Sequence, residues 1–399
     1  MKKISLYEFK HNVAQINQLD PIVIQPQRAK GVYIWDVNGK DYIDMLSGIC
    51  VANVGHSNKN VINAIKKQID QYMHVTVYGE YIQSQQYKYI KRLKEFLPSN
   101  LNQIFYVNSG SEAIEGAIKT AKLYNHRPEI ISYKNSYHGA TMTCVSMLSD
   151  ENYREDFLPL LPDTNNIEFN NETDLQKITE KTCCVIAETI AVGAGVELPK
   201  NDYLIKLRKR CDEVGAVLIL DEIQTGFGRT GSLFAFQQYG FVPDILCIAK
   251  AMGAGLPIGA FIGSDEIMNH LNDNPHPLIG HATTYGGNPV CLASALASLN
   301  YIVEDINMEE VKQKGEYYRT HLKHKLIKEV RGIGLFNCFL LQESVSWEKV
   351  LAECYKQGVI VGTHLFNSNC ISIKPPLIIT QQEIDESIRR ITIALNNIR

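Results

Sequence analysis

The chain lacks the features that would point to nucleic acid or a membrane. Its 40 basic and 43 acidic residues leave a net charge of only -3 at pH 7, and the lysines and arginines are scattered. A nucleic-acid or anionic membrane surface is therefore not expected as a partner. No window approaches the roughly 18 apolar residues of a membrane span, and the opening MKKISLYEFKHN has no apolar core behind its lysines. We expect a cytoplasmic protein that acts on a small molecule.

The sequence also lacks paired cysteine motifs. Its ten cysteines include no CxxC pair, and most lie inside apolar runs, such as Cys247 in ILCIAK. Buried free thiols in a reducing compartment fit this pattern better than disulfides or a zinc site. We therefore expect no bound metal.

Repeats, low-complexity tracts and long linkers are absent too, and 399 residues with 45% hydrophobic content are typical of a globular protein. Strand-like runs alternate with helix-like segments through the middle of the chain, which predicts an α/β fold with a parallel sheet and helical crossovers. These runs are QIFYV (103–107), EIISY (129–133), CCVIAE (183–188), AVLIL (216–220) and DILCIA (244–249).

The two ends of the chain have a different character. Near the start, GVYIWDVNGKDYIDML predicts a hairpin that turns at Asn38-Gly39. After residue 290 a helix, the short strands GLFNCFLL, GVIVGT and NCISI, and a helix after Thr380 are expected. We assign residues 51–289 to a large α/β domain and residues 1–50 and 290–399 to a smaller α+β domain.

Charged side chains follow two strands of the expected sheet. The run VLILDEIQTGFGRTG places Asp221 and Glu222 after a buried strand, and the next strand is followed by Lys250. The carboxyl ends of parallel strands meet at one edge of a sheet, so Asp221 and Lys250 should face the same crevice. A lone lysine at such a place is usually a solvated surface residue, but this one has an acidic neighbour.

Two loops add groups of another kind. In YVNSGSEAIEGAIK a helix should open near Ser111, and its free N–H groups would suit a phosphate, although an ordinary capped helix is at least as common. In YKNSYHGAT, Tyr137 and His138 precede Gly139, where an aromatic ring could stack on a flat ligand or belong to an ordinary loop. No GxxxxGK[ST] or GxGxxG motif supports a nucleotide site.

A phosphate site, a stacking ring, a carboxylate and a lysine amine together describe the needs of pyridoxal 5′-phosphate. Its aldehyde forms a Schiff base with a lysine, and its protonated ring nitrogen needs an acidic partner. Lys250 and Asp221 would meet these two needs. Gln224 could reach the phenolic oxygen of the ring.

With these motifs the sequence resembles the class III aminotransferases, a fold type I family that includes ornithine, acetylornithine, 4-aminobutyrate and ω-amino acid aminotransferases. The resemblance runs over nearly the whole chain. It is carried by GVYIWDVNGKDYIDMLSGICVANVGH, NSGSEAIEGAIK, SYHGAT, LILDEIQTGFGRTG, IAKAMGAGLPIGA, HATTYGGNPV and KPPLIIT. It implies a large domain with a mixed, mostly parallel seven-stranded sheet, a smaller α+β domain, and a homodimer with shared active sites.

The resemblance also implies roles for individual residues. Lys250 would carry the Schiff base and move the proton between the substrate carbon and the cofactor, while Asp221 would hold the ring nitrogen. The remaining cofactor-binding positions are Ser109, Gly110 and Ser111 at the phosphate, Tyr137 and His138 at the ring, Gln224 at its phenolic oxygen, Glu188 at the rim, and Thr283 and Thr284 toward the cofactor of the neighbouring subunit.

The sequence departs from the family pattern at the substrate. Many members carry a glutamate where this chain has Gly193, and an arginine three residues before a Pro-Pro pair, where this chain has Ser372. Ala140 stands where ornithine and acetylornithine enzymes commonly have arginine. The bidentate clamp for an α-carboxylate is thus lost. Lys374 could supply a charge, provided that no bulge separates its face from that of Ser372, although a solvated lysine is the simpler interpretation.

These losses are shared by amine and ω-amino acid transaminases. They favour a donor amine on a non-α carbon, with pyruvate or 2-oxoglutarate as the acceptor, in a ping-pong reaction. Acetylornithine or ornithine aminotransferase is the alternative activity. A decarboxylase, aminomutase or racemase on the same fold is another, and a catalytically silent binding protein is disfavoured by the retained acid and amine.

Overall fold

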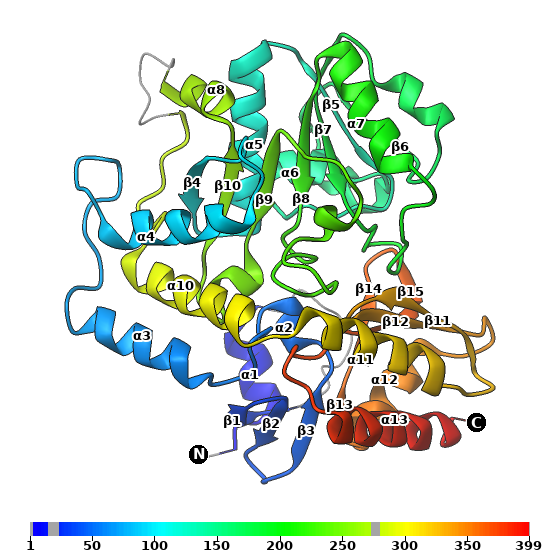
Figure 1. Ribbon diagram of the computed structural model, residues 1–399. Helices are drawn as coiled ribbons and strands as arrows, with labels where there is room; N and C mark the ends of the chain where they lie inside the picture. Colours follow the sequence, from blue (N-terminus) through cyan, green and yellow to red (C-terminus); the bar gives the residue numbers. More distant parts are fainter. Residues whose placement is uncertain (1–2, 15–23, 273–279, 399) are drawn as a thin grey trace.

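The computed structural model describes residues 3–14, 24–272 and 280–398. Its centre is a seven-stranded sheet in the order β4-β10-β9-β8-β7-β5-β6 (Figure 1). The strands are β4 (Gln103–Val107), β5 (Glu129–Tyr133), β6 (Thr164–Ile167), β7 (Thr182–Glu188), β8 (Val217–Asp221), β9 (Ile245–Ile248) and β10 (Gly259–Gly263). Strand β10 pairs antiparallel with both β4 and β9, and the other neighbouring pairs are parallel.

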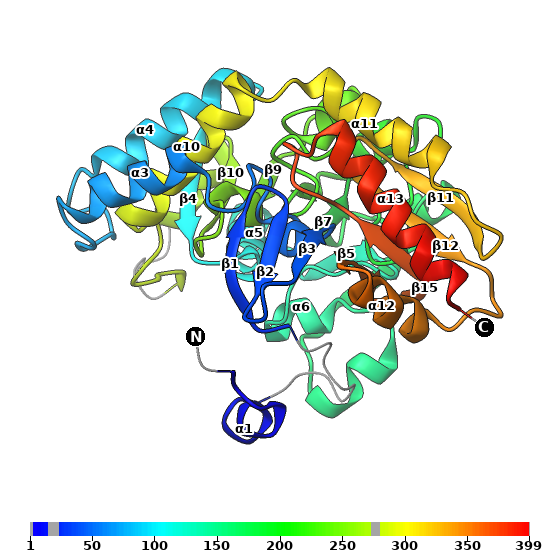
Figure 2. The same cartoon turned by 90° about the horizontal axis from the view of Figure 1, so that it is seen from below.

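Helices cover both faces of this sheet because its strands are apolar on both sides. Along β7, Cys184 and Ile186 face one apolar core and Val185 and Ala187 face the other, as the alternation of a strand requires. The first core contains α5 (Gly110–Asn125), α6 (Met142–Ser146) and α8 (Asp265–Met268). The second contains α3 (Lys59–Ile69), α4 (Ser84–Leu93), α7 (Tyr203–Val214) and α10 (Pro289–Glu304). Helices α3, α4 and α10 lie side by side in both views (Figures 1 and 2).

Two four-stranded sheets form the lower part of the molecule in Figure 1. One has the order β1-β2-β3-β13, with β1 (Pro26–Lys30), β2 (Tyr33–Asp36), β3 (Asp41–Asp44) and β13 (Val359–Ile360). The other has the order β11-β12-β15-β14, with β11 (Ile327–Ile333), β12 (Phe336–Leu341), β14 (Gly362–His364) and β15 (Asn367–Ile373). Helices α11 (Met308–His321), α12 (Trp347–Lys356) and α13 (Gln381–Asn396) pack against them, and α1 (Leu6–Asn12) lies apart from the rest in Figure 2.

The predicted elements agree closely with these. The hairpin through Asn38-Gly39 joins β2 and β3, which pair antiparallel. The five central runs are β4, β5, β7, β8 and β9, each within a residue of its expected bounds. All ten cysteines are free, and nine are buried, as expected.

Among the residues that the structure describes, no single helix is both long and apolar enough to cross a bilayer. Helices α10 and α11 satisfy the criteria only when taken together, and they are bent by 80°.

Candidate active site

A cavity of about 840 Å³ opens at the carboxyl ends of β7, β8 and β9. Its opposite wall comes from β14, the end of β15 and the short helix α2 (Ser47–Cys50). The polar side chains that line it are Asn108, Ser109, Ser111, Tyr137, His138, Glu188, Asp221, Gln224, Thr225, Lys250, Thr363, His364, Ser372 and Lys374. Among these described residues the only lysines or arginines are Lys250 and Lys374.

Asp221 is the last residue of β8 and is buried at the base of the cavity. Its Oδ2 lies 2.7 Å from His138 Nδ1, and its Oδ1 accepts a hydrogen bond of 3.0 Å from the Ile223 N–H. Burial alone would lower the pKa of His138, but the hydrogen bond and the charge of Asp221 raise it above its usual value. These two contacts hold the carboxylate of Asp221 in one orientation, in which it can accept a hydrogen bond.

Lys250 follows β9, the strand that pairs with β8, and begins a short 3₁₀ turn, Lys250–Gly253. Its φ of +47° lies in the left-handed region, which non-glycine residues seldom adopt and which is often found at functional sites. Its positive charge acts on both Glu188 and Lys374. The expectation that Asp221 and Lys250 face one crevice is met, because both line this cavity.

The amino end of α5 also lines the cavity. Ser109 is the N-cap, and its side chain accepts from the Glu112 N–H at 3.2 Å. The N–H groups of Gly110 and Ser111 come before the first intrahelical bond, so they are available to a ligand. The Ser111 hydroxyl accepts from the Ala140 N–H at 3.3 Å and keeps its own proton to donate. This end of the cavity suits an anion.

Tyr137 and Glu188, two of the predicted cofactor-binding residues, also line the cavity. Tyr137 is 43% exposed and lines the cavity, so its ring has a free face. Glu188, the last residue of β7, is buried, and burial raises the pKa of its carboxyl group to about 8. It therefore carries a proton near neutral pH and can donate a hydrogen bond.

Gln224 and Lys374 form a contact that the sequence did not predict. The ammonium of Lys374 donates to Gln224 Oε1 at 3.0 Å, and Nζ lies 4.4 Å from the centre of the Phe336 ring. Lys374 and Ser372 both line the cavity, so no bulge separates their faces. Burial is the main cause that lowers the pKa of Lys374 to about 8, and the charge of Lys250 contributes.

Ser372 does not offer a proton to a ligand. His364 Nδ1 lies 2.6 Å from the Val192 carbonyl oxygen, which can only accept, so Nδ1 carries the ring proton. Burial and the charge of Lys374 lower the pKa of His364 well below its usual value, which keeps the ring neutral. Nε2 must then accept, and the Ser372 hydroxyl, 2.9 Å away, donates to it.

Gly193 cannot be exchanged for a larger residue in this conformation. A Cβ atom at this position would overlap the Asn135 carbonyl oxygen and the Phe366 ring. The Phe366 N–H also donates to the Gly193 carbonyl at 3.1 Å, which fixes the loop against the segment after β14. The space that a glutamate side chain would need is therefore filled.

Neither Thr283 nor Thr284 lines this cavity within the single chain. Thr283 lines a separate cavity beside Tyr106 and Lys119, and its hydroxyl accepts from the Asn108 side-chain amide. Thr284 is exposed. Their expected contact with a neighbouring subunit stays a prediction.

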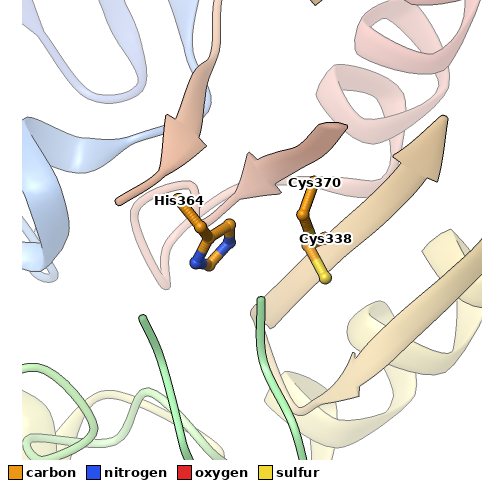
Figure 3. A group of neighbouring side chains, drawn as sticks. All are labelled: Cys338, His364 and Cys370. Carbon is orange, nitrogen blue, oxygen red and sulfur yellow. The ribbon is translucent and has the colours of Figure 1, made fainter. Parts of the chain in front are cut away.

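Beside the cavity lies a buried group with the side-chain types of a metal site: Cys338 of β12, His364 of β14 and Cys370 of β15 (Figure 3). Their donor atoms lie within 4.8 Å of one another. A cation here would meet the positive charges of Arg331 and Lys374, and both ring nitrogens of His364 are already hydrogen-bonded. We interpret the group as a thiol pair next to a neutral imidazole. The sequence separates these residues too widely to predict the group.

Pyridoxal 5′-phosphate fits the main cavity. Asp221 offers a fixed carboxylate at the base, the amino end of α5 offers N–H groups for the phosphate, and Lys250 offers an amine in the same cavity. Tyr137 adds an aromatic ring on the wall. These are the donors and acceptors that this cofactor requires.

Comparisons with known proteins agree with the geometry. Residues 14–395 match the family model described as Aminotransferase class-III. An acetylornithine aminotransferase of Methanocaldococcus jannaschii is 37% identical, over 96% of this chain and 95% of that protein. A putrescine aminotransferase of Pectobacterium atrosepticum is 36% identical, over 87% of this chain and 77% of that protein.

A solved structure shares both the fold and the expected cofactor. The ornithine aminotransferase from Toxoplasma gondii, crystallized with oxidized glutathione and described with partial occupancy of pyridoxal phosphate at its active site, superposes with a TM-score of 0.88. It is 26% identical, and the match covers 99% of this chain and 95% of that one.

Proposed function

Because the chain belongs to the class III family of pyridoxal-phosphate-dependent aminotransferases, we propose that it moves an amino group from a non-α carbon to a 2-oxo acid. The donor is an ω-amino acid or an amine, and the acceptor is pyruvate or 2-oxoglutarate. The family membership sets the cofactor and the reaction type. The donor class is our proposal.

The lack of an arginine clamp carries this proposal. No arginine is among the described residues that line the cavity, and the hydroxyl of Ser372 is used by His364. At Gly193, the Asn135 carbonyl and the Phe366 ring occupy the space that a larger side chain would need. A donor that carries an α-carboxylate would therefore find no bidentate partner for that group.

The side chains of the cavity fit the roles that the reaction needs. Bound pyridoxal phosphate supplies an electron sink for the carbon that carries the amine. Asp221, oriented by His138, would hold the ring nitrogen, and the amino end of α5 would bind the phosphate. Lys250 would bind the cofactor covalently and, when released, move the proton at its Nζ.

A homodimer is the assembly that we propose. The loop that precedes α4 and the loop that precedes α10 meet at the surface, where the rings of His74 and Tyr285 lie 5.1 Å apart. Tyr285 is 61% exposed and Met73 64% exposed, so this face is apolar and open. Thr284 lies on the same loop, where it could reach a second copy.

The free thiols support the reducing cytoplasm as the compartment.

Acetylornithine or ornithine aminotransferase is the second candidate activity. The named relative from Methanocaldococcus jannaschii favours it. Its substrate would carry an α-carboxylate at the end remote from the reacting amine, so another cation would have to bind that group. A decarboxylase or aminomutase reaction would instead leave the cofactor in its aldehyde form after each turnover.

The spectrum of the bound cofactor tests the donor class. Single donors are added to the holoenzyme without any oxo acid, and the aldehyde-form band is followed with time. The set contains N-acetylornithine, ornithine, 4-aminobutyrate, β-alanine, putrescine and an aromatic amine. We expect the fastest loss with one of the last four. A faster reaction with N-acetylornithine or ornithine would instead support the second candidate.

Replacement of the lysine tests the reaction type. Lys250→Ala should abolish turnover while cofactor is still bound in part, because Asp221 and the amino end of α5 remain. Steady-state assays and the cofactor content of the purified variant measure the two effects. Substantial transamination by this variant would contradict the assignment of Lys250.

A further inference from the structure

We propose that Lys374 binds the carboxylate of the 2-oxo acid acceptor, as a single cation in place of an arginine clamp. This inference rests on the proposed transamination. It identifies the group that holds the acceptor in a cavity with no arginine among its described lining residues. An amine donor without a carboxylate would not need it, whereas every 2-oxo acid would.

Lys374 is built into the cavity wall with a fixed backbone. Its N–H donates to the Met45 carbonyl at 2.6 Å, and its carbonyl accepts from the Ser47 hydroxyl at 2.8 Å. Only 4% of the residue is exposed, and its ammonium lies over the ring of Phe336. A lysine held in this way is not a solvated surface residue.

The ammonium has no anionic partner in the described part of the chain. Its one hydrogen bond goes to the neutral amide of Gln224, and none of the ion pairs among the described residues includes it. The ionisable groups that favour its charge are the thiols of Cys50, Cys338 and Cys370. A buried ammonium with one neutral acceptor is incompletely satisfied, and a ligand carboxylate would complete its environment.

Position supports the same conclusion. Lys374 lies close enough to Lys250 for the charge of Lys250 to contribute to the lowered pKa of Lys374. The carboxylate of a 2-oxo acid is bonded directly to the carbonyl carbon that must react, so its binding group has to stand near the reacting lysine. Ser372 is excluded as that group because its proton is donated to His364.

The protonation state of Lys374 sets when it can bind. With a pKa of about 8, the free side chain is an ammonium below pH 8 and becomes a neutral amine as the pH rises. The groups that face it are Gln224, Lys250, His364 and the thiols of Cys50, Cys338 and Cys370. The affinity for the 2-oxo acid should therefore fall above pH 8. The binding of a donor without a carboxylate should not depend on the charge of Lys374.

The test separates the two halves of the reaction in Lys374→Met, which keeps an unbranched side chain but removes the ammonium over Phe336. One half-reaction converts the aldehyde form of the holoenzyme with putrescine, and the other converts the amine form with pyruvate. We expect the concentration of pyruvate at half-maximal rate to rise by about 30- to 100-fold. The maximal rate with putrescine should change by less than about threefold.

Two further variants make the result specific. Lys374→Arg should recover most of the pyruvate affinity because it restores a cation. Lys209→Met, which removes an exposed lysine of α7, should behave like the wild type. An unchanged pyruvate affinity in Lys374→Met would overturn the proposal. So would an equal loss in both half-reactions together with a lowered melting temperature, because that would show a structural role.

Equilibrium binding keeps this test separate from the proposed function. Propionate, which cannot react, is titrated into the holoenzyme in a calorimeter at pH 7 and pH 9.5. Wild type should bind it more weakly at pH 9.5, and Lys374→Met should bind it weakly at both pH values. If no donor converts the cofactor but these affinities follow the expectation, the donor proposal fails while the carboxylate site stands. If propionate affinity is the same in both proteins, the carboxylate site fails.

Discussion

Two adjacent carboxylates, Asp221 and Glu222, have opposite environments. Asp221 faces the cavity and His138. Glu222 is fully buried and does not line the cavity. It accepts hydrogen bonds from the hydroxyls of Thr189 and Thr225 and from the backbone N–H groups of Ala235 and Phe236. Burial still raises the pKa of Glu222. One acid is thus available for chemistry, and the other fixes the loop that follows it.

His138 is expected to act as a positioning residue for Asp221. His138→Phe removes one of the two hydrogen bonds that orient the carboxylate, so kcat should fall by about 10- to 100-fold, or roughly 1.4 to 2.8 kcal/mol. Steady-state kinetics and cofactor content measure the change. His138→Gln, which can still donate, should lose less. Equal kcat values for His138→Phe and wild type would disprove this role.

The sequence was sufficient to bring Asp221 and Lys250 to one cavity, since the ends of neighbouring parallel strands must meet there. It could not show that Lys374 is buried and bonded to Gln224, because that contact joins segments 150 residues apart. The proton arrangement around His364 was equally hidden. It depends on the carbonyl of Val192, and backbone acceptors have no sequence signature.

Among the elements, those with strong local signals were predicted and those set by tertiary contacts were not. The five apolar runs of the centre are strands, and Thr380 caps α13 with a capping box. Strand β10, GAFIG, was missed because two glycines and an alanine weaken its strand pattern. The backbone of α2 was equally unpredictable. Its Ser47, Ile49 and Cys50 have positive φ values, which only the surrounding contacts can enforce.

Helix α13 is joined to the hairpin by a charge network that depends on pH. Glu386 accepts from both Arg389 and Arg390, and Arg390 reaches Asp41 at 2.9 Å. The hydrogen bonds from Arg389, more than those from Arg390, lower the pKa of Glu386 to about 2. This stabilisation is present above pH 4.5, the usual pKa of the carboxyl group, and is lost as the pH falls toward 2.

Glu386→Gln should therefore lower the free energy of unfolding by about 1 kcal/mol at pH 7. The difference from wild type should shrink as the pH is lowered from 4.5. Urea unfolding at pH 7, 5, 4 and 3.5 follows it. Glu343→Gln, at an exposed turn before α12, is the matched control and should show no such trend. A difference that stays constant over this range would contradict the network.

For the molecule as a whole, Arg229 connects the loop after β8 to the smaller sheets. It is fully buried and donates to the carbonyls of Leu335 and Pro375, to the Ser47 hydroxyl and to the Asn53 side chain. These acceptors come from three separate parts of the chain: residues 47–53, Leu335 and Pro375. Pro375 follows Lys374 and Ser47 lies in α2, so the guanidinium ties the loop after β8 to the opposite wall of the cavity.

Arg229→Met should cost roughly 3 to 5 kcal/mol of unfolding free energy, since it leaves four buried acceptors without donors. Arg229→Lys should cost less, because an ammonium can still donate three bonds. Denaturant unfolding of the apoprotein measures both, with the exposed Arg28→Lys as control. A loss below 1 kcal/mol in Arg229→Met would show that the segments are held by other contacts.

The parallel pairing of β3 with β13 affects how the chain is made. Val359 aligns with Ile43, and the ribosome reaches Val359 315 residues after Asp44. At about 5 to 20 residues per second, one edge of β3 stays open for roughly 15 to 60 s after the hairpin emerges. During that interval the hairpin can pair with a neighbouring nascent chain, so the amino-terminal sheet needs protection while the rest of the protein is being synthesised.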